Sequence, residues 1–109
     1  MEIYSKKGQK YYEPESLSPL ANLVSKRMRE KNLSGVELSE RSGVPTSILS
    51  YYLRGKRRFS VSHIVRIALA LGLDAFEMAR IQSDDIISEY IKSTFNKEDN
   101  DEVSVNRKT

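Results

Sequence analysis

Apolar residues recur at helical spacing through the middle of the chain, and capping residues mark where each helix begins and ends. Ser18 followed by Pro19 is a typical helix start, and the stripe that follows it predicts a helix to about Lys31. The stripe has the spacing i, i+3, i+4 and i+8: Leu20, Leu23, Val24 and Met28. Asn32 can end this helix.

A capping box and a glycine bound the next predicted helix. Ser34 and Glu37 have the S-x-x-E spacing in which each side chain accepts a hydrogen bond from the other residue's backbone N–H. Gly43 stands where the chain must leave the helix in a left-handed conformation, which a β-carbon penalises. The pattern therefore predicts a helix over 35–42.

A second short helix follows this turn. Pro45 has a φ angle that suits a helix start, and Leu49 and Tyr52 give residues 46–53 an apolar face at i, i+3. The same spacing turns Tyr51 outward. Two helices joined in this way are typical of a DNA-binding helix-turn-helix, in which the second helix enters the major groove.

Further helices are predicted on both sides of Gly72. Ser60 is expected to cap the first of them, and Gly72 to end it. Its inward face is expected to hold five residues: Val61, Ile64, Val65, Ala68 and Leu71. Asp74 and Glu77 form a second capping box, for a helix that carries three apolar residues: Ala75, Phe76 and Met78.

Beyond Ser83 the pattern predicts a separate amphipathic helix, with Asp84 and Asp85 favourably placed in its first turn. Its apolar face packs either on the domain or on a second copy of the chain, and comprises Ile86, Ile87, Tyr90, Ile91 and Phe95.

The chain of 109 residues therefore divides into four predicted parts. Residues 1–17 form a leader without a clear period, 18–82 a helical domain, 83–95 the amphipathic helix, and 96–109 a polar, acidic tail that we expect to be disordered. The predicted fold class is all-α, with five to six helices.

Charge is unevenly distributed along the chain. Residues 22–80 hold eleven Lys or Arg and five Asp or Glu, whereas residues 81–109 hold four and seven. A basic domain suits a polyanionic partner, although such an excess is also common on soluble surfaces. The absence of cysteine excludes disulfides and thiolate metal sites, and no apolar run approaches the ~20 residues of a membrane span. We therefore expect a cytoplasmic protein, associated with the nucleoid when it is bound to DNA.

The stretch LSGVELSERSGVPTSILSYYLRG, followed by Lys56 and Arg57, resembles the phage lambda-repressor-like family (Cro/CI-type, also called XRE-type). The resemblance extends over about residues 20–76. Gly35 stands where the family usually has Gln, and Leu38-Ser39 where it usually has Leu-Ala.

This resemblance implies a sequence-specific transcription regulator, more a repressor than an activator. It also implies a homodimer on an inverted repeat in double-stranded DNA, with no cofactor and no enzymatic activity. Met28 and Leu53 stand where many members place a partly buried Arg–Glu pair. Because both are apolar here, we expect a hydrophobic contact in place of the pair.

The resemblance also assigns the candidate DNA contacts. Four residues near the start and on the outer face of the second motif helix are expected to reach base edges: Thr46, Ser47, Ser50 and Tyr51. Phosphate contacts are expected at the start of the first motif helix and in the cationic loop: Ser34, Gly35, Arg54, Lys56, Arg57 and Arg58.

Other interpretations stay open at this stage. Lys6, Lys7, Lys10, Tyr11 and Tyr12 could form a basic arm on DNA, or belong to a loosely packed leader. The single histidine, His63, has no second ligand nearby in the sequence and is expected to be a surface or half-buried helix residue. An antitoxin or adaptor that mainly binds a partner protein is the alternative function, and the segment 83–95 would then bind the partner.

Overall fold

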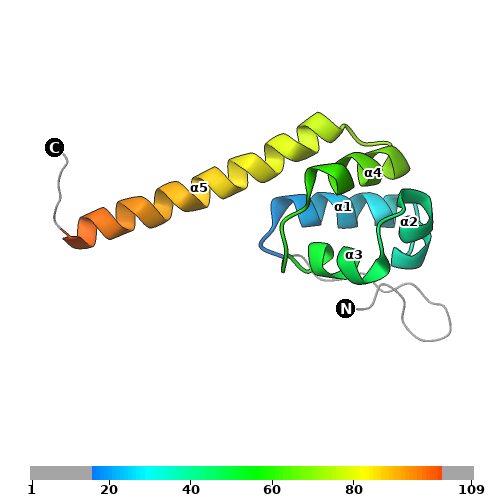
Figure 1. Cartoon of the computed structure of the whole chain (residues 1–109), viewed down its shortest axis with the longest axis horizontal. Helices are drawn as coiled ribbons and strands as arrows, with labels where there is room; N and C mark the ends of the chain where they lie inside the picture. The colour runs from blue at the N-terminus through cyan, green and yellow to red at the C-terminus, as the bar shows by residue number, and fades with distance from the viewer. Residues whose placement is uncertain (1–15, 102–109) are drawn as a thin grey trace.

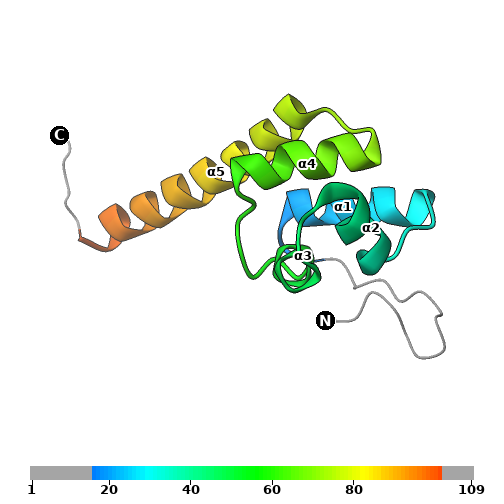
Figure 2. The same ribbon diagram turned by 45° about the vertical axis from the view of Figure 1, so that its right-hand side comes forward.

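The computed structural model describes residues 16–101, and their side chains as far as residue 95. These residues form five α-helices and no strand, so the described part of the chain is all-α (Figure 1). The helices are α1 (Pro19–Glu30), α2 (Gly35–Ser42), α3 (Thr46–Leu53), α4 (Val61–Leu71) and α5 (Ala75–Asp101). In both ribbon views α3 lies on the opposite side of the domain from α4, and most of α5 extends away from the other helices (Figures 1 and 2).

The predicted caps are present at the helix ends. The Ser18 hydroxyl accepts a hydrogen bond from the Ala21 N–H (3.1 Å). The Ser34 N–H donates to Glu37 Oε1 (2.8 Å) while the Glu37 N–H donates to Ser34 Oγ (3.1 Å), which completes the capping box. Gly43 has a φ of 78° and ends α2 in the left-handed conformation. The predicted bounds of α2 and α3 are therefore confirmed.

The core lies between the first four helices and the beginning of α5. Met28 of α1 and Leu53 of α3 are both buried in this core, and the direct contact expected between them stays a prediction. α1 contacts α3 and α5, and α2 contacts α3 and α4. This packing holds the two motif helices against a common apolar centre.

The predicted inward face of α4 is partly wrong. Val61 and Val65 are exposed, and Ile67 is buried in their place. The buried stripe comprises Ile64, Ile67, Ala68 and Leu71. Both stripes have helical spacing, and α4 is rotated toward the second because it packs against α2 and α5.

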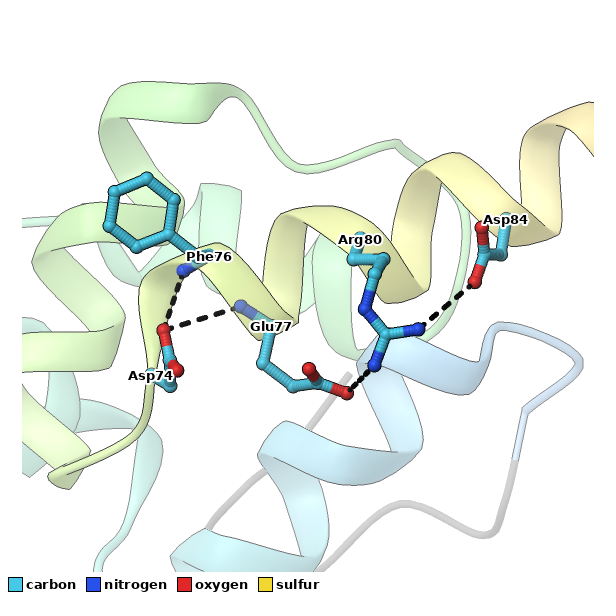
Figure 3. A network of polar contacts seen from close by, with 5 residues as sticks. All are labelled: Asp74, Phe76, Glu77, Arg80 and Asp84. Carbon is cyan, nitrogen blue, oxygen red and sulfur yellow. Dashed lines mark hydrogen bonds and ion pairs between the residues drawn. The ribbon is translucent and has the colours of Figure 1, made fainter.

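The prediction of a separate helix beyond Ser83 is also wrong, because α5 is continuous from Ala75 to Asp101. This stretch contains neither Gly nor Pro, so nothing in the backbone chemistry interrupts it. Arg80 also connects successive turns, since its guanidinium pairs with Glu77 (2.5 Å) and with Asp84 (3.6 Å; Figure 3).

At the start of α5, one of the two hydrogen bonds of the predicted capping box is present. Asp74 Oδ1 accepts hydrogen bonds from the N–H groups of Phe76 (2.9 Å) and Glu77 (3.3 Å; Figure 3). The Glu77 carboxylate bonds Arg80 instead of completing the box. This hydrogen bond and the charge of Glu77, with a smaller effect of Asp84, hold the pKa of Arg80 above its ordinary value.

The two ends of the chain bear on three predictions. The basic arm and most of the leader lie in residues 1–15, outside the described residues. α5 extends through residues 96–101, where the sequence predicts the first part of the disordered tail, and residues 102–109 lie outside the description. Within residues 16–101, no helix is long and apolar enough to cross a membrane.

Candidate nucleic-acid interface

α3 has one face in the core and one face in solvent. Leu49, Tyr52 and Leu53 are buried. On the other side, Thr46 and Ser47 are exposed and Ser50 is half-buried. The structure thus places hydroxyl groups in the first turn and along the outer face of this helix, as the sequence predicts.

Tyr51 and Tyr52 are neighbours with opposite environments. Tyr52 is 2 % exposed and stacks on Phe59, with 4.3 Å between the ring centroids. Tyr51 is 46 % exposed. The predicted directions of the two rings, one inward and one outward, are therefore confirmed.

The Tyr52 hydroxyl ties α3 to α4. It accepts a hydrogen bond from the Ser60 N–H (3.3 Å) and lies 2.6 Å from His63 Nδ1. Because a hydroxyl carries a single hydrogen, it can donate to Nδ1 while it accepts from Ser60. His63 is half-buried, and its ring nitrogen thus has a structural partner. Among the described residues, no group of three or more His, Cys, Asp or Glu is placed to hold a metal ion.

The end of α3 determines the path of the cationic loop. The Gly55 N–H donates to Tyr52 O (3.0 Å) and the Lys56 N–H to Tyr51 O (2.9 Å), which is the bond pair of a Schellman motif. Gly55 has a φ of 71°, the left-handed conformation that this motif requires. Lys56 therefore follows α3 by a defined turn.

Two residues that the sequence analysis did not single out hold the other end of the loop. Phe59 is buried, and its N–H and carbonyl bond the side-chain amide of Gln82 on α5 (2.8 and 2.9 Å). The buried position of Phe59 could have been suspected from the sequence, because a large aromatic residue follows three cations there. No local pattern marks Gln82, because its partner lies 23 residues away.

The cations of the loop lie beside Tyr51. Lys56, Arg57 and Arg58 are exposed, and Lys56 and Arg57 line a shallow hollow of about 250 Å³ with Tyr51. Arg54 is half-buried, with its guanidinium carbon 5.5 Å from the centre of the Tyr51 ring. The structure therefore brings one predicted base-contacting residue next to several predicted phosphate-contacting residues.

The start of α2 is more enclosed than the sequence suggested. Ser34 is fully buried, Gly35 is also buried, and the Ser34 N–H donates to Glu37. A phosphate contact at Ser34 would share that N–H with the Glu37 carboxylate. The contacts predicted at Ser34 and Gly35 stay predictions.

The leader joins the domain next to the cationic loop. Two hydrogen bonds hold Ser16 against Asn22 of α1. The Ser16 N–H donates to Asn22 Oδ1, and Asn22 Nδ2 donates to the Ser16 carbonyl, both at 2.8 Å. Its hydroxyl approaches Gly55 so closely that a β-carbon there would lie 3.2 Å away. The first described residue thus lies at the same edge of the domain as the loop cations.

Comparisons with known proteins agree with this geometry. Residues 24–78, half of the chain, match the model of a family described as helix-turn-helix. None of the curated proteins compared matches the chain.

The solved structures that are similar to this one include two regulators. The restriction-modification controller protein C.AhdI from Aeromonas hydrophila is 27 % identical, with a TM-score of 0.53, over 57 % of this chain and 94 % of that one. The clp gene regulator ClgR from Corynebacterium glutamicum is 21 % identical, with a TM-score of 0.54, over 77 % and 92 % of the two chains. The second likeness concerns the fold alone.

Proposed function

Since the chain belongs to the lambda-repressor-like helix-turn-helix family and is a DNA-binding transcription regulator, we propose that it is a repressor that reads an operator sequence through α3. The observation that carries this proposal is the outer face of α3, where Thr46, Ser47 and Ser50 lie in line with the exposed ring of Tyr51. Hydroxyl groups on a helix in the major groove can donate to or accept from base edges.

Holding the DNA is a separate role, which we assign to the loop after α3. The exposed side chains of Lys56, Arg57 and Arg58 carry three positive charges within a turn whose two ends are hydrogen-bonded to the domain. Such contacts position a protein on the duplex without reading its sequence. Arg54 belongs to the same set. Because its guanidinium lies over the Tyr51 ring, a phosphate contact made by Arg54 would be coupled to the base contact proposed for Tyr51.

We further propose that the protein binds as a homodimer to an inverted repeat. A single α3 of eight residues reads only a few base pairs. Two copies related by a two-fold axis would place two such helices in successive major grooves, and the operator would then repeat the symmetry of the protein. A repressor of this kind acts in the cytoplasm, by occupying its operator.

Selection of bound sequences from a random DNA pool tests the proposal. We expect an enriched palindromic consensus, and affinity for it that falls linearly with salt on logarithmic axes, by about 0.9 for each phosphate neutralised. Binding that stays flat from low to moderate salt, or a pool without any consensus, would contradict sequence-specific binding.

One observation favours a second candidate function, an antitoxin or adaptor. The outer half of α5 exposes Ile87, Tyr90 and Phe95, so it can contact a protein. If this function is correct, the full chain will retain a partner from cell extract and will show no salt-dependent affinity for any selected DNA.

A further inference from the structure

The outward side of α5 carries large apolar side chains that no part of the described chain covers. Phe76 is 88 % exposed, Tyr90 72 %, Ile87 55 % and Ile91 45 %. Side chains of this size are seldom left in water together on one helix. A helix that projects from its domain is also only marginally stable unless a partner packs against it.

These positions form one stripe along the helix. The spacing alternates between four and three residues, which is the period of a helix–helix seam: Phe76, Arg80, Ser83, Ile87, Tyr90 and Thr94. Ile91 flanks the stripe. The seam is polar in its middle, at Arg80 and Ser83, and mainly apolar toward both ends.

The opposite side of α5 is already occupied. Met78 is buried in the core, and Gln82 bonds the end of the cationic loop. One turn further along, Asp85 and Ile86 line a groove of about 350 Å³ between α5 and that loop. The stripe therefore points away from the chain's own domain, and a contact made by the stripe leaves the DNA-binding loop free.

We propose that the stripe pairs with the same stripe of a second copy, with the two α5 helices antiparallel and the two-fold axis beside Ser83. The inference rests on the homodimer proposed above, to which it adds the surface and its register. A two-fold arrangement of this kind is closed, because each copy presents the same patch to the other.

The charges at the middle of the stripe favour the antiparallel orientation. A parallel pair would place Arg80 against Arg80 of the partner subunit. With the axis at Ser83 and a rise of about 1.5 Å per residue, the two arginines are offset by about 9 Å along the helices, while Arg80 and the partner's Asp84 are only about 3 Å apart in height. Each guanidinium could then lie between its own Glu77 and Asp84 and an acid of the other copy.

The apolar ends of the stripe match in the same register. Phe76 is level with the partner's Tyr90, so each end of the contact contains an aromatic pair. Covering the exposed apolar side chains on both copies would bury roughly 1,000 Å² in total, which is the lower limit for a biological interface. The proposed contact is therefore at the small end of the range for a dimer.

Single cysteines test the register, because the natural chain contains none. We expect Ser83→Cys to be joined efficiently by a short bis-maleimide in the absence of DNA. Thr94→Cys, on the same stripe, should remain unlinked, since its two copies would be about 33 Å apart along the helices. Equal cross-linking at both positions would show a parallel pair, and linking at Thr94 alone a different register. Either result overturns the proposal.

A charge in the apolar part of the stripe tests the surface itself. Ile87→Glu should convert the dimer to a monomer, measured by light scattering, with an unchanged helical circular dichroism spectrum. The exposed Ser93→Glu, off the stripe, is the matched control and should remain dimeric. A dimer that survives Ile87→Glu overturns this surface but leaves the proposed homodimer standing. A natural chain that is monomeric overturns both, whereas DNA selection reports on the proposed reading of an operator in either case.

Discussion

The hydroxyl of Tyr52 links α3 to the start of α4. Replacing it by Phe keeps the stacking on Phe59 and removes the contacts to His63 and to the Ser60 N–H. We expect Tyr52→Phe to lower the free energy of unfolding by about 1 kcal/mol, the usual net value of a hydrogen bond. Denaturant unfolding measures it, and Tyr51→Phe on the exposed neighbour should cause no change. Equal effects of the two substitutions would contradict this assignment.

Gly43 is the other single residue on which the motif depends. Its φ is 78°, and a β-carbon there would also lie 3.0 Å from the guanidinium of Arg66. Gly43→Val should destabilise the domain by more than ~1 kcal/mol, because a β-branched residue strains this conformation. Gly43→Asn should be milder, since Asn tolerates the left-handed region better. Thermal melting compares the two, and a valine variant as stable as the natural chain would contradict the strain.

At the scale of elements, substitutions in α3 and in the loop that follows it should have different effects, because the two elements are expected to make different kinds of DNA contact. Lys56→Ala and Arg57→Ala should weaken binding to operator and random DNA alike and reduce the salt slope by about one each. Thr46→Ala and Tyr51→Ala should each cost roughly 1–3 kcal/mol, mainly on the preferred site, if they contact bases.

Binding selections on the same four variants check this separation. The consensus should change for the α3 variants and stay the same for the loop variants. Should all four keep one consensus and lose affinity equally, α3 would not read the bases, and the arm at Lys6 to Tyr12 would be tested next.

For the whole molecule, dimerisation through α5 should set the affinity for a complete operator. Ile87→Glu leaves α3 and the loop intact, so its affinity for a single half-site should equal that of the natural chain. Its affinity for the complete inverted repeat should fall at least tenfold, because the two half-sites are no longer bound by one linked dimer. Gel shifts on both DNAs measure this. A variant that still prefers the complete site would show that the two domains are joined by another surface.

Much of the fold could be predicted because its signals are local. The capping box of Ser34 and Glu37 and the left-handed turn at Gly43 bond groups only a few residues apart, so the bounds of α2 and α3 follow from neighbouring residues. The inward direction of Tyr52 and the outward direction of Tyr51 follow from the helical period alone. The DNA contacts named for α3 and for the loop after it lie next to one another on the accessible side of the domain, whereas those named at Ser34 and Gly35 are buried. The roles of all of them stay predictions.

The sequence by itself therefore determined the motif, since caps, turns and period are short-range properties of the chain. Only the tertiary structure decided which of two adjacent stripes of α4 is buried, because the docking of α2 and α5 sets the rotation of that helix. It also decided the partnership of Phe59 with Gln82, which joins residues 23 apart. The tertiary structure also decided which side of α5 faces outward, because Met78 on the opposite side is buried in the core and Gln82 there bonds the end of the cationic loop.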